Sequence, residues 1–154
     1  MSGAAENAPP GHEPVVLDFA ATPDATRQAL GSVRAALAQA GLAPMLVSRV
    51  EMVLAEVLNN IVEHAYTGEA GGRAWLVAQV RGGAVSVTIT DRGTPVPRHR
   101  LGRTALPDAD VPRDRLPEGG FGWYLIHSQT DSLGYRREDG ANILELRFWP
   151  HPGA

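Results

Sequence analysis

Apolar residues with helical spacing mark two long helices in the first half of the chain. In residues 44–66, apolar side chains recur at intervals of three and four, as the buried face of a helix requires. They are Val50, Val53, Leu54, Val57, Leu58 and Ile61. An earlier helix is expected to begin at Thr22-Pro23, because Thr is a favourable N-cap and Pro a favourable first helical residue, and to end at Gly41.

Short apolar runs and alternation of apolar with polar residues predict five strands. They are expected at residues 15–20, 74–81, 84–91, 133–137 and 142–149. Gly82-Gly83 reads as the turn of a hairpin between the second and third strands, and Asp139-Gly140 as the turn between the last two. In the last strand, Leu144, Leu146 and Phe148 are expected to face the core.

A third helix is expected at residues 121–130, opened by the glycines of 119–122. Before it, residues 92–118 show no period and contain five prolines and six arginines. A loop this long within a compact domain is usually functional or disordered. The order of elements predicts an α+β fold, a two-layer sandwich with helices on one face of a mixed, mostly antiparallel sheet.

Composition narrows the class of protein. A length of 154 residues with 44% hydrophobic content fits one packed domain, expected at 15–150 behind a flexible tail, 1–14. Without cysteine, disulfides and thiolate metal sites are excluded, and all fourteen basic residues are Arg, which excludes a P-loop or Schiff-base lysine. The net charge of −3 argues against a nucleic-acid binder. Without an export signal or a long apolar stretch, a cytoplasmic location away from the membrane is expected.

Glu56, Asn60 and His64 form the first candidate site. Their spacing of four places them on one helical face, opposite the apolar stripe. An amide oxygen suits Mg²⁺, and a carboxylate one turn away can accept a proton from an attacking hydroxyl. The alternative is an ordinary solvated face of an amphipathic helix.

Two glycine-containing motifs add to this site. Asp91, at the end of a strand, could accept a hydrogen bond from an adenine amino group, and Gly93 would let a flat ring approach the backbone. Gly120 and Gly122 open a helix, where free amides can bind an anion. Taken singly, the first motif is usually a plain turn and the second a plain glycine cluster.

The order and spacing of these motifs resemble the Bergerat, or histidine-kinase-like, ATPase fold shared by gyrase-type topoisomerases, the Hsp90 chaperone, histidine kinases and MutL. Within that superfamily, the segments AEVLNNIVEHAY, ITDRGTPVP and EGGFGWYLIHSQTDSLGYRREDGANILELRF look like those of the bacterial anti-sigma-factor serine/threonine kinases of partner-switching systems. The similarity covers about residues 15–149.

The resemblance implies a role for each motif. Glu56 would be the catalytic base, Asn60 the Mg²⁺ ligand, and Asp91 the acceptor for adenine, with Gly93 beside the ring. Gly120 and Gly122 would contact the phosphates. Residues 94–118 would form a lid over ATP, from which Arg113 or Arg115 could reach the phosphates, while His64 would be structural or contact the lid. Ile143 takes the place of a threonine that the family often has in the last strand, near the adenine.

The implied function is that of an ATP-dependent protein serine kinase with Mg²⁺. Its substrate would be a STAS-type anti-anti-sigma protein, a sigma factor would be a second partner, and the family suggests a homodimer. Two alternatives stay open: an ATP-binding module that sequesters a partner without catalysis, which the presence of Glu56 argues against, and a detached histidine-kinase catalytic domain.

Overall fold

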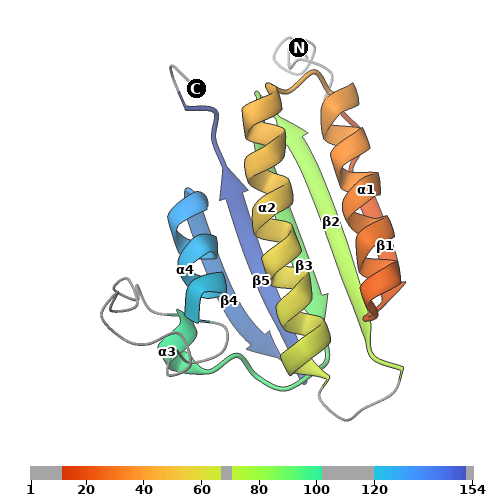
Figure 1. Ribbon diagram of the computed structural model, residues 1–154, viewed down its shortest axis with the longest axis vertical. Coiled ribbons are helices and arrows are strands. Elements are labelled where there is room, and N and C mark those ends of the chain that lie inside the picture. Colours follow the sequence, from red (N-terminus) through yellow and green to blue (C-terminus); the bar gives the residue numbers. More distant parts are fainter. Residues whose placement is uncertain (1–11, 67–70, 102–119, 152–154) are drawn as a thin grey trace, which may run out of the picture.

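A five-stranded sheet and a layer of helices on one of its faces make up the described part of the chain, residues 12–66, 71–101 and 120–151 of a computed structural model (Figure 1). The strands are β1 Val15–Ala20, β2 Arg73–Arg81, β3 Ala84–Asp91, β4 Ser132–Glu138 and β5 Ala141–Phe148. The helices are α1 Pro23–Gln39, α2 Pro44–Asn60, a π-helical turn η1 Ile61–Ala65, a short α3 Arg98–Leu101 and α4 Gly120–Gln129. Residues 1–11 of the predicted tail lie outside this description.

The strand order is β1-β2-β3-β5-β4, and all four described pairings are antiparallel. The α+β class with helices on one face is confirmed, but the expectation of a mixed sheet is wrong. The chain returns after α4 so that β4 runs in the same direction as β3, and β5 lies between them, so these two strands never pair. Gly82 and Gly83 have φ of 58° and 80°, as a two-residue hairpin turn requires.

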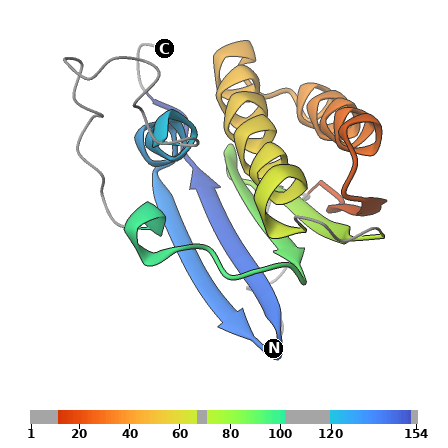
Figure 2. The same ribbon diagram turned by 60° about the horizontal axis from the view of Figure 1, so that its bottom comes forward.

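The hydrophobic core lies between the sheet and the helices. The helix α2 lies between α1 and α4 (Figure 1), and the helices all lie over the same face of the sheet (Figure 2). The predicted apolar stripe of α2 is buried throughout, and Leu144, Leu146 and Phe148 face it from β5 as expected. The opposite face of the sheet carries polar side chains of β3 such as Ser86 and Thr88, which are only partly buried. None of the described helices is both long and apolar enough to span a bilayer.

The helix boundaries differ from expectation at two places. The sequence predicts one continuous helix to residue 66, whereas α2 ends at Asn60 and continues as the wider turn η1. There, the carbonyls of His64 and Ala65 accept hydrogen bonds from the side chain and backbone of Thr94. Such π-helical turns are frequent at functional sites. The other difference is α3, whose four residues are too few to show a period in the sequence.

Candidate functional site

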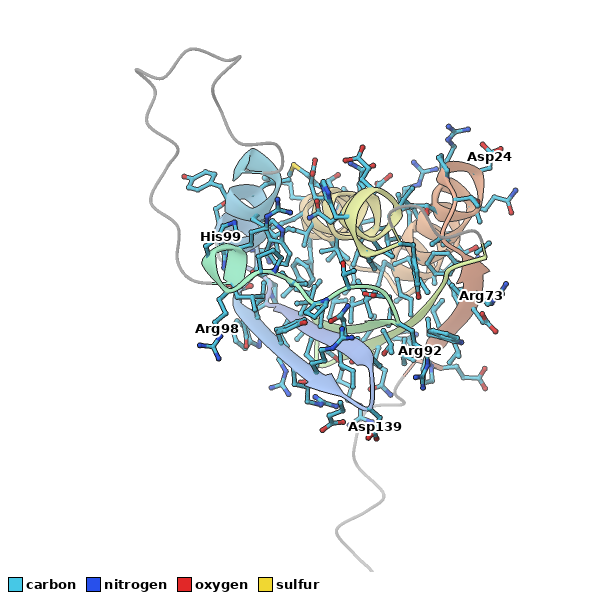
Figure 3. The ribbon with its side chains drawn as sticks, turned by 90° about the horizontal axis from the view of Figure 1, so that it is seen from below. Asp24, Arg73, Arg92, Arg98, His99 and Asp139 are labelled. Atoms are coloured by element: carbon cyan, nitrogen blue, oxygen red, sulfur yellow. The ribbon has the colours of Figure 1, made fainter. Side chains whose placement is uncertain are left out.

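A pocket lies between the C-terminal end of α2, η1, the sheet and the segment that follows β3. It holds about 590 Å³ of empty space, part of it open to solvent. Figure 3 looks onto this end of the molecule, with Arg98 and His99 of α3 on one side and Arg92, just after β3, toward the other. The apolar wall includes Val57, Ile61, Ile89, Val96, Trp123 and Leu144.

Asp91 is the buried charge in this pocket, with 5% of its surface exposed. Its Oδ1 accepts hydrogen bonds from the Gly93 amide and from Asn142 Nδ2, both at 2.9 Å. Burial raises the pKa of Asp91, an effect that these two bonds and the nearby Arg137 only partly offset. Its other oxygen, Oδ2, accepts no hydrogen bond from the described residues, so a donor on a ligand in the pocket can reach a carboxylate acceptor.

Gly93 is needed for close packing of the backbone. A Cβ built on Gly93 would lie 2.2 Å from the carbonyl oxygen of Ala65 in η1. The next residue, Thr94, donates its amide to that same oxygen at 2.8 Å. The missing side chain therefore lets η1 approach this backbone closely, a reason for glycine that the sequence did not suggest.

Asn60 and His64 line the pocket, as the spacing predicted. The Nδ2 of Asn60 is buried and has no hydrogen-bond partner within the described ranges. An amide can present its oxygen or its nitrogen by rotating, so Asn60 has a polar group available to a ligand. The Nε2 of His64 lies 3.7 Å from the Glu63 carboxylate.

A magnesium ion fits this donor set only if the nucleotide supplies most of its ligands. Across residues 12–66, 71–101 and 120–151, no three His, Cys, Asp or Glu side chains are grouped as a metal site. Mg²⁺ usually keeps several waters and binds substrate phosphates with one or two protein oxygens. The amide of Asn60 suits that role.

Glu56 does not line the pocket. It lies one turn before Asn60 and faces the first turn of α4, where a Cβ on Gly122 would come 2.8 Å from Glu56 Oε2. The helix α4 begins at Gly120, in agreement with the prediction that the glycines open a helix. The structure thus brings Glu56 beside the predicted phosphate-binding glycines, while Asn60, His64 and Asp91 share the pocket.

The first part of the predicted lid also contacts the pocket. Val96, Pro97 and Arg100 line it, and His127 of α4 forms a hydrogen bond of 3.0 Å with the Arg100 carbonyl. The rest of that segment, including Arg113 and Arg115, lies outside the described residues.

Ile143 does not line the pocket, contrary to the expectation that it lies near the adenine, whereas its neighbour Asn142, which the sequence analysis did not single out, does. Buried residues alternate along β5, so Asn142 and Leu144 line the pocket while Ile143 projects from the other face. Asn142 pairs directly with Asp91 across β3 and β5. The same alternation that predicted Leu144 and Leu146 as core residues also places residue 142 inward, and it was the available signal.

The sequence matches the family described as histidine kinase-like ATPase domain over residues 19–148, so the chain belongs to that family. This confirms the resemblance that the motifs predicted. The serine-protein kinase RsbW of Bacillus thuringiensis (strain Al Hakam) is 28% identical over 99 residues, or 64% of this chain and 61% of the relative. The RsbW of Bacillus anthracis (strain CDC 684 / NRRL 3495) is 27% identical over the same shares. The alignment thus covers about three-fifths of the length of these curated relatives.

Among solved structures, the chain is similar to the RsbU and RsbW domains of Rv1364c from Mycobacterium tuberculosis. The TM-score is 0.64 at 18% identity, and the similarity covers 90% of this chain and 32% of that chain. At this identity the likeness establishes the fold.

Proposed function

We propose that this protein binds ATP with Mg²⁺ in the pocket and transfers the γ-phosphate to a serine or threonine of a partner protein. The observation that carries the proposal is the buried Asp91 carboxylate in an apolar pocket of a histidine kinase-like ATPase domain. Adenine would fill the pocket, and its amino group would donate to Asp91 Oδ2. A charged acceptor held away from water gives a strong hydrogen bond to such a donor.

The phosphates would extend from the pocket toward the start of α4. The amides at Gly120 and Gly122 would bind them, because the first turn of a helix presents free N–H groups and partial positive charge. Asn60 would hold Mg²⁺ through its amide oxygen, and the ion would neutralise phosphate charge during transfer.

Glu56 would act as the base. The hydroxyl oxygen of the substrate forms a bond to the γ-phosphorus, the bond from that phosphorus to the bridging oxygen of ADP breaks, and the hydroxyl proton passes to Glu56. The contact between Glu56 and Gly122 supports this role, because it places the carboxylate beside the turn assigned to the phosphates. Holding the reacting groups together in this way supplies much of the rate in phosphoryl transfer.

The substrate would be a STAS-type anti-anti-sigma protein, and the protein would also sequester a sigma factor in the cytoplasm, as a homodimer. This rests on the resemblance to partner-switching kinases and on relatives named serine-protein kinases. The phosphorylation state of the anti-anti-sigma protein would then decide which complex forms.

One observation favours a second candidate, an ATP-binding module without catalysis: Glu56 does not line the pocket. The experiment that separates the candidates is incubation with γ-labelled ATP, Mg²⁺ and a STAS-domain protein from the same genome. Acid-stable phosphate on the partner is expected. Binding of ATP without transfer would favour the non-catalytic module, and acid-labile phosphate would favour a histidine-kinase domain.

A further inference from the structure

Asn142 is the centre of a buried hydrogen-bond network at the base of the pocket, with 3% of its surface exposed. Its Nδ2 donates to Asp91 Oδ1 at 2.9 Å and to the Thr94 carbonyl at 2.8 Å, and a third acceptor, the Gly93 carbonyl, lies at 3.4 Å. Its Oδ1 accepts from the Tyr135 hydroxyl at 2.6 Å and from Arg137 Nη1 at 2.8 Å.

These contacts use the whole capacity of the side chain. A carboxamide has two N–H donors and one oxygen with two lone pairs. Both donors and both lone pairs of Asn142 are engaged by protein groups, so no hydrogen bond is left for a nucleotide base, although Asn142 lines the pocket.

The same network holds the segment that leaves β3. Tyr135 accepts the Val96 amide at 3.2 Å, and Arg137 donates to the Gly93 carbonyl at 3.0 Å. Together with the bond from Asn142 to Thr94, these contacts fix three of the four residues at 93–96. Networks of this kind rigidify a site when every member is satisfied.

We propose that Asn142 is a positioning residue for base recognition: it holds the Asp91 carboxylate with Oδ2 toward the pocket, and Asp91 alone of this pair contacts the base. This inference rests on the proposed function. It assigns to Asn142 the selectivity for an amino group on the purine, exerted through Asp91 rather than by contact.

The charged groups around Asp91 predict a second effect of losing the Asn142 donor, a change in the pH dependence of ATP binding. Arg137 and the hydroxyl of Tyr135 approach from β4, and His64 and Arg100 line the same pocket from η1 and α3. Asn142 and Arg137 favour the ionised carboxylate, against the burial that raises the pKa of Asp91. Without the Asn142 donor the pKa of Asp91 rises further, so the carboxylate becomes protonated at higher pH and is lost as a charged acceptor.

The test compares the affinity for Mg-ATP with that for purine riboside triphosphate, which lacks the 6-amino group, by calorimetry. The wild type is expected to prefer ATP by roughly 10–100-fold, the range for a hydrogen bond to a charged group. Asn142→Leu keeps the approximate size but removes the donor and should reduce this preference to about threefold or less. On acidification, the affinity of the variant for ATP should begin to fall at a higher pH than that of the wild type. Its affinity for the analogue should show no such shift.

One control separates positioning from packing. Ile143→Ala alters the opposite face of β5, so it should keep the preference for ATP. If Asn142→Leu does not fold, Asn142→Ala provides the same comparison. Equal weakening of both nucleotides, or an unchanged preference, would overturn the inference while leaving the proposed function standing. A wild type that binds neither nucleotide would overturn both.

Discussion

The carboxylate of Glu56 lies against the backbone of Gly122, so that a Cβ at residue 122 would come 2.8 Å from Glu56 Oε2. This contact joins the polar face of α2 to the first turn of α4, two elements that are far apart in the sequence. A carboxylate is stabilised at the first turn of a helix, which is also where a phosphate binds. In the proposed mechanism, a bound phosphate therefore lies next to Glu56, the general base.

Gly122→Ala should impair phosphate transfer more than folding. The added methyl would meet the end of the flexible Glu56 side chain, which can move away and leave its position. We expect transfer to fall by about tenfold or more, while the free energy of unfolding changes by less than about 1 kcal/mol.

The matched control is Gly31→Ala, since a Cβ there meets nothing within 4 Å in α1. It should stabilise the fold by about 0.5–1 kcal/mol and leave transfer unchanged. Urea unfolding and an initial-rate assay measure the two effects. A wild-type rate in Gly122→Ala would show that the contact has no catalytic importance.

Gly93→Ala should destabilise the fold itself. Its Cβ would lie 2.2 Å from the Ala65 carbonyl oxygen, and a backbone group cannot rotate away as a side chain can. We expect a loss of about 1–3 kcal/mol in urea unfolding, as for other overpacked sites. Gly134→Ala is the control, because its Cβ would make only an ordinary contact of 4.0 Å with Glu145. Equal stability of the two variants would contradict the packing role.

Asp91→Asn should separate stability from binding. Burial raises the pKa of Asp91 in the folded protein above its pKa in the unfolded chain. The stability that this carboxyl group contributes is therefore present at low pH and is lost as the pH rises from the unfolded-state pKa through the folded-state pKa. At neutral pH the wild type is destabilised by a buried charge that the amide of the variant lacks. The Tm of the nucleotide-free variant should therefore equal or exceed that of the wild type at pH 7, and this advantage should disappear at acidic pH.

Nucleotide binding by Asp91→Asn should change in the opposite direction. The introduced amide would present an N–H toward the adenine amino group in place of an acceptor, at a loss of roughly 2–3 kcal/mol. Thermal melts at pH 7 and at acidic pH, each with and without ADP, measure both the stability and the nucleotide binding of the variant. Wild-type nucleotide affinity in a folded variant would remove Asp91 from the adenine site.

Asn60→Ala should weaken the binding that depends on Mg²⁺. The metal would lose its protein oxygen, so the affinity for ATP with Mg²⁺ should fall toward the affinity without it. The neighbouring Asn59→Ala removes the same group from an exposed position and should bind like the wild type. Calorimetry with and without Mg²⁺ makes the comparison. The metal assignment fails if Asn60→Ala retains the full effect of Mg²⁺ on affinity.

Local sequence patterns predicted most of the fold, because burial follows the period of each element. The stripe of α2 and the alternation of β5 are examples, and both are buried as expected. The turn η1 was not predictable in this way. Its carbonyls bond to Thr94, a distant partner in the sequence that a helical period does not reveal.

The candidate site shows the same division between local and distant information. Helical spacing grouped Glu56, Asn60 and His64, but packing against α4 turns Glu56 toward Gly122 and leaves the other two in the pocket. The pairing of Asn142 with Asp91 depends on the register of β3 against β5. That register is set by the whole sheet, so alternation could place Asn142 on the inward face but could not indicate its partner.

The rate of phosphate transfer by Glu56→Gln at saturating Mg-ATP tests the proposed kinase most directly. The variant keeps the size of the side chain but cannot accept the hydroxyl proton. We expect wild-type affinity for Mg-ATP and a loss on the order of 10²–10⁴-fold in acid-stable phosphate transferred to the STAS partner, the usual contribution of a general base. Glu51 lies on the same helix as Glu56 and forms an ion pair with Arg34 of α1, so Glu51→Gln should transfer phosphate normally. A wild-type rate in Glu56→Gln would contradict the assignment of Glu56 as the base.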